Sequence, residues 1–549
     1  MSYRYRPLQY DDEIRLVEIR PDPYCSGAIH CEIIHRRRSD PSLKYEALSY
    51  TWGGISKSKR IVINTSCEFS VTPNCYDALR RVRHLEGTRL IWIDAICINQ
   101  EDNKERTRHV RAMGDIYEGA SQVLVYLGEA DADSKRLFEH ISEVCGRNDG
   151  ELYGSYDDKS FRVPALVKTA RAVLQRPWFS RIWVLQEVFH GMGNVIVVCG
   201  PDSTFWDVFA SCCINLCASG ADGFDYYSPR LPYALNIGTD NSIRSLYDLL
   251  CETRHANATD DRDKFFAILS MVDDKDVATL ASYDQSTVMV YTAIGLYLLR
   301  NVKLVLLLSV RHCHSRYPAL ASWIPDWSYT DDNDPFWISN PIPPIDDPKE
   351  YNPELHVLGC CRRNSAESDH LFHPVLSVSG FRAGFITSLG ATFDFESYSA
   401  TCLEVIKRVW ESKGHTNDTG YLPPGFTVEC KCCDIKVSQS FADRFAKGYN
   451  EKEFRNLWCR RHGSGGNTCF NFEFVEGAMR NCRLFLDENN HLGLAPREAA
   501  VGDAICVIEG ACDPCILRER PQGDWFLVSG ECYFEWEPDE PNKEIFAIW

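Results

Sequence analysis

Short apolar runs alternate with amphipathic stretches along the first two hundred residues, and this alternation predicts an α/β fold. Leu90 to Ile93 and Val123 to Leu127 are apolar without polar alternation, as expected for strands that are covered on both faces. Between these runs, apolar residues recur at the spacing of one amphipathic helix, at Val110, Met113, Tyr117 and Ala120. The stretch therefore predicts a β-α-β unit in a parallel sheet with helices on both faces.

Two further runs extend this pattern, Tyr45 to Tyr50 and Val195 to Cys199. The four expected parallel strands end near Tyr50, Asp94, Leu127 and Cys199, and a right-handed wind brings these ends to one edge of the sheet. Polar residues follow directly after one of these strands, at Asp94, Asn99 and Gln100. Open α/β sheets usually place their ligands at this edge, so we expect a site to begin here.

The remaining patterns divide the chain into four regions. Alternating residues from Glu13 to Arg20 and from Ala28 to His35 predict a β-hairpin ahead of the parallel strands. We expect an α/β domain over residues 1–204, a mainly helical region over 205–330, a linker and mixed α/β region over 331–477, and a small β unit over 478–549. Prolines between Pro341 and Pro353 mark the linker, and short strands with glycine turns mark the last region.

Composition and charge indicate which classes of binding partner and which cellular location to expect. Of 549 residues, 44% are hydrophobic and 25% are charged, which is typical of globular proteins. The 59 basic and 77 acidic residues give a net charge of −18, which disfavours nucleic acid as a partner. The N-terminus has no signal-peptide pattern, and Leu296 to Val310 is interrupted by charges and shorter than the roughly 20 residues of a membrane span. We expect a soluble, cytoplasmic protein with no membrane span and with reduced cysteines.

The chain lacks the sequence motifs of known zinc modules and of several common enzyme classes. A cysteine-rich group with one histidine does not match the spacing of a known zinc module, and it comprises Cys430, Cys432, Cys433, Cys459 and His462. Cys512 and Cys515 form a further pair whose spacing matches no such module, and the run from His312 to His314 has no second pair nearby. We therefore expect no metal site, although zinc at the first group stays open. The chain also lacks the P-loop, dinucleotide-binding, zincin and α/β-hydrolase motifs.

The longer motifs resemble those of the fungal heterokaryon-incompatibility family, known as HET-domain proteins. The matching pieces occur in order from about Tyr45 to Tyr533: YEALSYTWGG, WIDAICINQ, IYEGASQVLVYLGE, RPWFSRIWVLQEV, DRDKFFAILSMV, SWIPDWS, LGLAPREAAVGDAICVIEG and SGECY. The resemblance implies a role in programmed cell death after incompatible fungal cells fuse.

A more distant resemblance links this family to TIR domains, which have a flavodoxin-like α/β core and in some members cleave NAD. LSYTW and LIWID are similar to the first two TIR strands, and SRIWVLQE is similar to the stretch in which a tryptophan precedes a helical glutamate. In enzymatic TIR domains that glutamate is catalytic, so the resemblance points to Glu187. Here Trp183 is followed by Val184 where TIR domains usually have cysteine, and roughly fifty residues separate Leu127 from Glu187, which suggests an inserted helix.

The resemblance implies NAD as a substrate rather than a cofactor. Glu187 would hold the ribose and stabilise the positive charge that develops on the sugar. We expect the remaining side chains to bind the substrate by stacking or hydrogen bonding, and they comprise Trp52, Trp178, Trp183, Asn99, Ser49 and Asp94.

Each of these residues also has a structural explanation. Glu187 can be an ion-pair partner, Asp94 a cap of the following turn, each tryptophan a core anchor and Cys97 a packed thiol. Three functions stay open from the sequence: an NAD hydrolase, a non-enzymatic module that self-associates or docks a protein partner in non-self recognition, and a HET-fold enzyme that acts on another small molecule.

Overall fold

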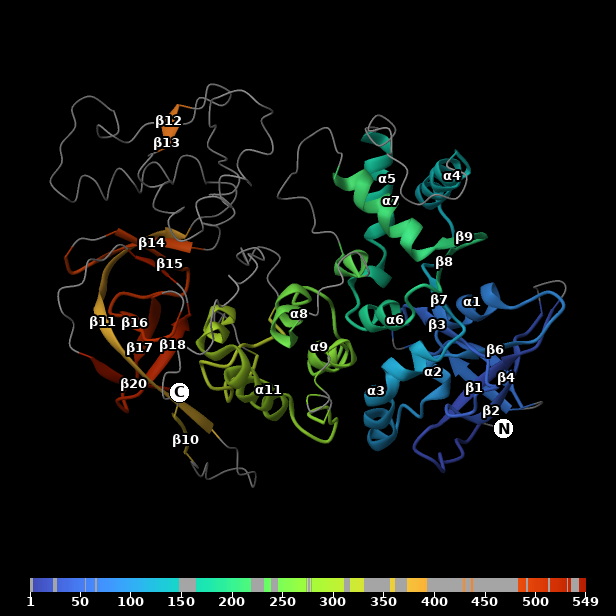
Figure 1. Ribbon diagram of the computed structural model, residues 1–549, viewed down its shortest axis with the longest axis horizontal. Helices are drawn as coiled ribbons and strands as arrows, with labels where there is room; N and C mark the ends of the chain where they lie inside the picture. The colour runs from blue at the N-terminus through green and yellow to red at the C-terminus, as the bar shows by residue number, and fades with distance from the viewer. Residues whose placement is uncertain are drawn as a thin grey trace.

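The computed structural model describes most of the chain, and the account below is confined to those residues (Figure 1). The described residues are 3–22, 27–54, 56–64, 67–147, 164–218, 232–237, 245–272, 274, 277, 279–310, 316–329, 356–360, 373–392, 428–429, 436–437, 482–489, 492–511, 514–530, 532–534 and 543–549. The proline-rich linker, the run at His312 and the cysteine group from Cys430 to His462 lie outside them.

The predicted parallel strands form the centre of the N-terminal sheet. They are β3 (Glu46–Tyr50), β6 (Arg89–Trp92), β7 (Gln122–Tyr126) and β8 (Val195–Cys199). β3 pairs in parallel with β6 on one side and with β7 on the other, and β7 pairs in parallel with β8. In chain order these strands lie 2-1-3-4, which is the flavodoxin-like arrangement. The prediction of a flavodoxin-like α/β core is confirmed.

The whole sheet is mixed rather than purely parallel, because antiparallel strands extend both edges. Within the described residues the order of nine strands is β5-β4-β2-β1-β6-β3-β7-β8-β9. The added strands are β1 (Glu13–Ile19), β2 (His30–Arg37), β4 (Lys59–Ile63), β5 (Cys67–Val71) and β9 (Asp202–Phe205). β1 and β2 form the predicted hairpin, in register from Glu13 opposite Arg37 to Ile19 opposite Cys31. The hairpin continues the sheet because β1 pairs antiparallel with β6.

The helices begin and end where local chemistry favours it. α1 (Pro73–Val82) starts at Thr72, whose side chain accepts the amide hydrogen of Cys75, with proline in its first turn. The segment between β6 and β7 is split into α2 (Asp94–Cys97) and α3 (Asn103–Glu118), where one helix was expected. Asp102 accepts two amide hydrogens at the start of α3 and so begins a new helix there. α4 (Ala132–Arg147), α5 (Pro164–Leu174) and α7 (Trp206–Ala218) pack together beside the sheet (Figure 1).

The middle of the chain is helical, as predicted. Its elements are η2 (Tyr233–Asn236), α8 (Leu246–Glu252), α9 (Asp263–Phe266), η3 (Leu269–Met271), α11 (Thr287–Val302) and η4 (Lys303–Ser309). Among the described residues one segment, Thr287–Ser309, has the length and apolar composition of a membrane span, and half of its most apolar window is buried inside the structure. A buried core helix of a globular protein meets the same criterion.

The last region is a β unit that closes on itself. Its long strand β11 (His373–Thr392) pairs with β20 (Glu544–Ile548), β16 (Ala504–Ile508) and β14 (Cys482–Asp487) in turn along its length. β16 continues through β17 (Cys515–Glu519) to β18 (Trp525–Ser529), and β18 meets β20 beside β11. The ring is thereby closed, which protects its strand edges from further pairing. β10 (His356–Cys360), β15 (Leu492–Pro496) and β19 (Tyr533–Phe534) extend the sheet, and β12 (Val428–Glu429) pairs with β13 (Lys436–Val437) elsewhere.

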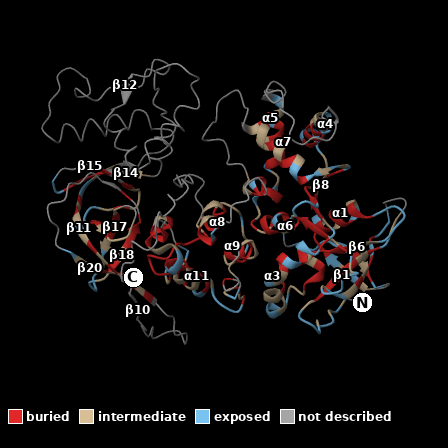
Figure 2. Ribbon diagram, in the orientation of Figure 1, coloured by how far each residue is buried: buried red, intermediate tan, exposed pale blue. Residues whose placement is uncertain are grey.

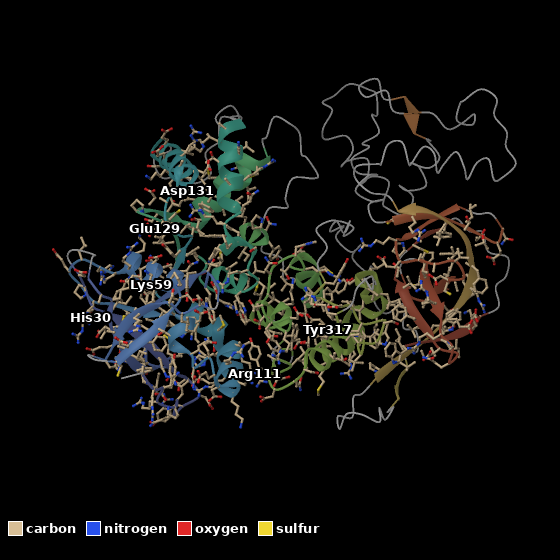
Figure 3. The ribbon with its side chains drawn as sticks, turned by 180° about the vertical axis from the view of Figure 1, so that it is seen from behind. His30, Lys59, Arg111, Glu129, Asp131 and Tyr317 are labelled. Atoms are coloured by element: carbon tan, nitrogen blue, oxygen red, sulfur yellow. The ribbon has the colours of Figure 1, made fainter. Side chains whose placement is uncertain are left out.

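One hydrophobic core runs from the N-terminal sheet through the helical region to the closed β unit (Figure 2). Where the α/β domain meets the helical region, Arg111 of α3 donates to the carbonyl oxygen of Ala281 at 3.0 Å (Figure 3). Where the helical region meets the closed β unit, the indole of Trp323 donates to the carbonyl oxygen of Pro374 at 3.0 Å. The helical region thus contacts both sheets.

Candidate functional site

The segment that carries Glu187 crosses the carboxyl ends of the central strands. Pro177 opens a short 3-10 turn, η1 (Pro177–Ser180), and α6 (Val184–His190) follows and ends at Gly191. The expected proline start and glycine stop are both present, although two short helices replace the single one expected. Trp183 is the residue that precedes α6, so Trp183 and Glu187 lie about one helical turn apart.

The Glu187 carboxyl is held by two neighbours, one from a strand and one from a helix. Its Oε2 accepts a hydrogen bond from the hydroxyl of Ser49 on β3, and the hydroxyl of Tyr117 on α3 also bonds to the carboxyl. Ser49 Oγ in turn accepts the indole hydrogen of Trp178 at 2.8 Å. Glu187 is only 2% exposed, and Ser49, Tyr117 and Trp178 are each 1% exposed. The expected neighbours of Glu187 are therefore packed against it instead of bordering open space.

Burial changes the acidity of Glu187. Removal from water raises the pKa of its carboxyl from 4.5 to about 7, because the charged form loses its hydration. The positive charge of Arg181 and the hydrogen bond from Ser49 oppose this shift, and the negative charge of Asp94 adds to it. A carboxyl with a pKa near 7 is divided between its acid and its base form at neutral pH, which is typical of groups that take part in catalysis.

Asp94 and Trp52 form a second pair at the same strand ends. The Trp52 indole, from the loop after β3, donates to Asp94 Oδ2 at 2.9 Å. Asp94 Oδ1 accepts the amide hydrogen of Ala95, the next residue of α2, and no side chain caps this short helix among the described residues. Burial raises the pKa of Asp94, while Arg181 and Trp52 lower it. The role of Asp94 in substrate binding stays a prediction.

The positive charge of Arg181 acts on both carboxyls, and sequence reasoning missed this residue. Its Nη1 donates to the carbonyl oxygen of Tyr50, at the carboxyl end of β3. The guanidinium lowers the pKa of both Asp94 and Glu187, yet among the described residues no carboxylate lies within ion-pair distance of it. Its side chain is partly exposed. Its position as the basic residue within the SRIWVLQE motif could have marked it as a candidate site residue.

The position of this cluster in the sheet is the one at which flavodoxin-like folds bind ligands. The strand order reverses at β3, since β6 follows it to one side and β7 to the other. Ser49 and Tyr50 are the last two residues of β3, and Asp94 comes just after β6. Ligands in open α/β sheets bind outside the carboxyl ends of strands at such a switch point. Glu187 and Arg181 are added to this edge by the segment before and within α6.

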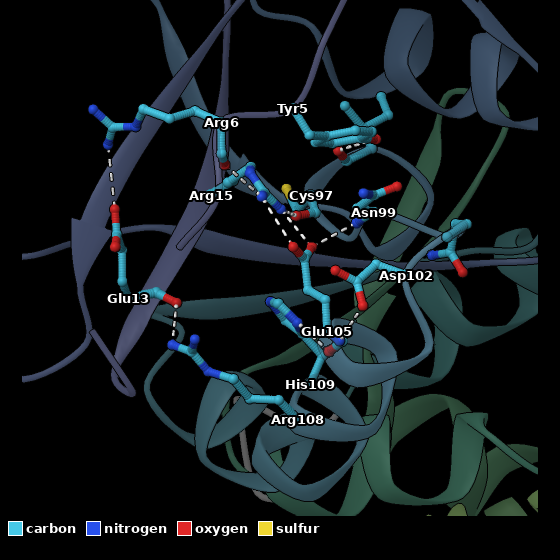
Figure 4. Close-up of polar contacts among 12 residues, drawn as sticks. Tyr5, Arg6, Glu13, Arg15, Cys97, Asn99, Asp102, Glu105, Arg108 and His109 are labelled. Carbon is cyan, nitrogen blue, oxygen red and sulfur yellow. Dashed lines mark hydrogen bonds and ion pairs between the residues drawn. The ribbon is translucent and has the colours of Figure 1, made fainter. Parts of the chain in front are cut away.

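Two of the expected substrate-binding residues point to other partners. Asn99 belongs to a turn in which its Oδ1 accepts the amide hydrogen of Glu101, and its own amide donates to Glu105 at 2.7 Å. Figure 4 shows Asn99 beside Arg15 and Glu105, in a cluster that ties β1 to α3. The indole of Trp183 donates to Asp263 of the helical region at 3.1 Å. The structure brings Ser49, Asp94 and Trp52 toward the Glu187 side of the sheet edge but not these two.

Trp178 lies in the core as an anchor, and Cys97 is a packed thiol. Trp178 packs against Phe179 and Trp206 with ring centres 5.0 and 5.6 Å apart, so its ring faces are used inside the core. Cys97 is fully buried, and burial raises the pKa of its thiol to about 12. A thiol held in its protonated form is a poor nucleophile.

One open hollow lies next to the Trp52–Asp94 pair. It is lined by Trp52, Lys57, Ser70, Val71, Thr72, Ala95 and Gln100. The hollow lies beside an aromatic ring and an exposed ammonium group, and it has room for about one water molecule. Across the described parts of the chain, no group of three or more histidine, cysteine or acidic side chains is arranged to hold a metal ion.

Comparison with known proteins points to one family. The sequence pattern of the family described as Heterokaryon incompatibility protein (HET) matches residues 45–187, which include β3 and end at Glu187. The chain is also similar to heterokaryon incompatibility protein 6, OR allele, of Neurospora crassa, with 24% identity over 654 residues that cover 95% of this chain and 93% of that protein. No solved structure shows significant similarity to this chain.

Proposed function

We propose, from the premise that this chain is a HET-domain protein of the fungal heterokaryon incompatibility family, that it acts in heterokaryon incompatibility as a NAD-cleaving effector. In this proposal the α/β domain resembles TIR domains and hydrolyses NAD to nicotinamide and ADP-ribose in the cytoplasm. Loss of NAD would then lead to the death of an incompatible fused cell. The observation that carries the proposal is the Glu187 carboxyl, with a pKa of about 7, at the switch point of a flavodoxin-like sheet.

The reaction needs little more than one well-placed carboxylate. The bond between nicotinamide and ribose breaks with its electron pair on the nicotinamide nitrogen, which leaves as a neutral base. Positive charge then develops on the ribose, and the ionised Glu187 stabilises it. Water attacks the sugar carbon and releases its proton, which yields ADP-ribose. Ser49 and Tyr117, which donate to the carboxyl in the resting protein, fix the orientation of Glu187.

Neighbouring groups supply charge and a stacking surface. Arg181 has guanidinium hydrogens to offer the diphosphate of NAD, since its described contact uses only Nη1. Trp52 and Lys57 would contact the other end of the nucleotide only after the hollow beside them widens, because it has room for about one water molecule. Because Glu187 is 2% exposed, the residues packed around its carboxyl must move apart before NAD reaches it.

This burial also favours a second candidate function. The buried Glu187 carboxyl accepts hydrogen bonds from Ser49 and Tyr117, as a carboxyl in a structural network does. In the alternative, the domain is a non-enzymatic module that self-associates or docks a protein partner during non-self recognition. A HET-fold enzyme that acts on another small molecule is the third alternative.

Nicotinamide release from NAD by the purified full chain separates these functions. We compare the wild type with Glu187→Gln, which keeps the shape of the side chain and removes its charge. The matched control is Glu129→Gln, because Glu129 follows β7 on the surface and pairs with Arg81 (Figure 3).

If the protein is an NAD hydrolase, the wild type and Glu129→Gln should release nicotinamide, and Glu187→Gln should release it at least about 100-fold more slowly. Equal release from all three proteins would remove Glu187 from the mechanism. No release from the wild type in any assembly state, measured by light scattering in the same samples, would favour the docking module.

A further inference from the structure

The segment that carries Glu187 is held from two sides. On one side β3 holds it, through Ser49 and through the carbonyl oxygen of Tyr50 that Arg181 contacts. On the other side the helical region holds it, although that region begins after the residues that match the HET family. The second set of contacts lies at the start of α6 and within it.

Backbone pairing joins the two parts just before α6. The amide of Ile182 donates to the carbonyl oxygen of Asn257 at 3.0 Å, and the amide of Asn257 donates to Ser180 at 2.5 Å. These bonds form a short parallel bridge between Arg181 and Asn257. One turn later the hydroxyl of Ser270 donates to Oε1 of Gln186 at 2.8 Å. The helical region thus contacts the chain on both sides of Trp183.

Asp263 is the charged member of this interface. Its Oδ2 accepts the indole hydrogen of Trp183 at 3.1 Å, and its Oδ1 accepts the hydroxyl hydrogen of Tyr283 at 2.6 Å. Asp263 is 8% exposed, and burial raises the pKa of its carboxyl to about 6. The guanidinium groups of Arg106 from α3 and of Arg262 lie over the Tyr283 ring at 4.1 and 5.1 Å from its centre.

α6 has no other anchor of this kind at its start. It is only seven residues long, and among the described residues no side chain caps its first amides. Short helices depend on tertiary contacts for their position, because their own hydrogen bonds are too few. The bond from Trp183 to Asp263 fixes the residue that precedes the helix, one turn before Glu187.

We propose that Asp263 is a positioning residue for NAD cleavage: through Trp183 it sets the start of α6 and thereby holds the Glu187 carboxyl against Ser49. This inference rests on the proposed function. It extends the functional unit beyond the matched residues 45–187 to include the helical region.

The experiment uses the full chain with Asp263→Asn and Trp183→Phe. Asparagine has one carboxyl-type oxygen in place of two, so it leaves either Trp183 or Tyr283 without its acceptor. Phenylalanine keeps the ring of Trp183 and removes the donor. Asp260→Asn is the matched control, since Asp260 pairs with Arg262 in the same interface but does not contact Trp183.

Two measurements are made on each protein. The first is nicotinamide release, resolved into kcat and KM. The second is a pH titration of the Trp178 indole hydrogen by nuclear magnetic resonance, with the signal assigned by Trp178→Phe. This hydrogen bonds to Ser49, which bonds to Glu187, so its shift reports ionisation of Glu187 without any need for activity.

We expect Asp263→Asn and Trp183→Phe to lower kcat by about 10- to 100-fold with KM changed less than about threefold, because small misplacements of a catalytic group are costly. The Trp178 titration midpoint should move upward in both variants, since Glu187 moves away from the donors that favour its charged form. Asp260→Asn should resemble the wild type in both measurements.

Wild-type values in both variants would overturn the proposal, as would an equal effect of Asp260→Asn. Unfolding of both variants while Asp260→Asn stays folded would also overturn it, because Asp263 would then support the fold alone. If the wild type releases no nicotinamide, the proposed function fails, and the Trp178 titration still decides whether Asp263 positions Glu187.

Discussion

The hydroxyl of Ser49 at the end of β3 donates a hydrogen bond to the carboxyl of Glu187 in α6, across 138 positions of the chain. Both side chains are buried, and the Trp178 indole completes the chain of hydrogen bonds. This contact joins a central strand of the sheet to the short helix that carries the candidate catalytic group. Several measurable consequences depend on it.

Ser49→Ala should lower the stability of the α/β domain by about 1–3 kcal/mol, because it leaves the buried Trp178 indole without its acceptor and removes one of the donors to the Glu187 carboxyl. It should also raise the pKa of Glu187 further, since one donor to the charged form is lost. Thermal unfolding followed by tryptophan fluorescence measures the first effect. The control is Ser121→Ala, which removes a partly buried hydroxyl that donates to the Tyr45 carbonyl oxygen. An equal, small effect of both changes would show that the Ser49 bond contributes little.

Glu187→Gln should make the protein more stable than the wild type as the pH rises. The pKa of Glu187 is about 7 in the folded state and near 4.5 in the unfolded state, so the folded state retains its proton longer. Wild-type stability therefore falls between about pH 4.5 and 7, by at most about 3 kcal/mol. The glutamine variant lacks this loss, and the difference should be complete near pH 8.

The difference between the unfolding midpoints of the two proteins, measured from pH 4 to pH 8, tests this prediction. Asp94 titrates in both proteins, so its contribution largely cancels in the comparison. A constant difference across this range would mean that Glu187 ionises with an ordinary pKa.

Arg15→Ala should be among the most destabilising single changes in the α/β domain. Arg15 is fully buried and donates to both carboxylate oxygens of Glu105, at 2.6 and 3.1 Å, and to the carbonyl oxygens of Cys97 and Arg6 (Figure 4). Its removal leaves the Glu105 carboxylate unpaired, which typically costs about 3–5 kcal/mol.

Arg37→Ala serves as the control for this change, because Arg37 makes a solvent-screened surface ion pair with Asp12 that should contribute little to stability. Urea unfolding of both variants measures the contrast. Similar midpoints for the two would show that the Arg15 cluster adds no net stability.

Gly530→Ala should loosen the contact between the closed β unit and the helical region. A Cβ atom at Gly530 would lie 1.8 Å from the carbonyl oxygen of Leu307, and a backbone atom cannot move aside cheaply. Limited proteolysis should therefore cut the variant faster than the wild type. Gly87→Ala is the control, since the nearest atom to its added Cβ lies 4.0 Å away. Equal cleavage rates for the two variants would contradict the close approach at Leu307.

Local patterns predicted the elements of the α/β domain well. The apolar runs that end at Tyr50 and Leu127 are strands because a strand covered on both faces needs no polar positions. The hairpin of β1 and β2 followed from alternation. The mixed character of the sheet was missed, because nothing local tells β1 to pair with β6 rather than to remain a separate hairpin.

The candidate site was predicted in part. Resemblance to TIR domains pointed to Glu187, and the strand-end rule pointed to Asp94. Arg181 was overlooked, although it precedes Trp183 by two residues in the same motif. The partner of Trp183 lies 80 positions away, so no periodicity could have revealed Asp263.

The sequence by itself determined which segments of the α/β domain are strands and which are helical, because the spacing of apolar residues, proline starts and helix caps act over a few neighbours. It also determined that polar residues follow the central strands. The breaks within the two expected helices, before Asn103 and before Val184, were seen only in the structure. Only the tertiary structure decided that Glu187 is buried against Ser49 and Tyr117, and that the helical region anchors the turn before it. The acidity of a side chain depends on its burial and on the charges around it, and residues far apart in the chain supply both.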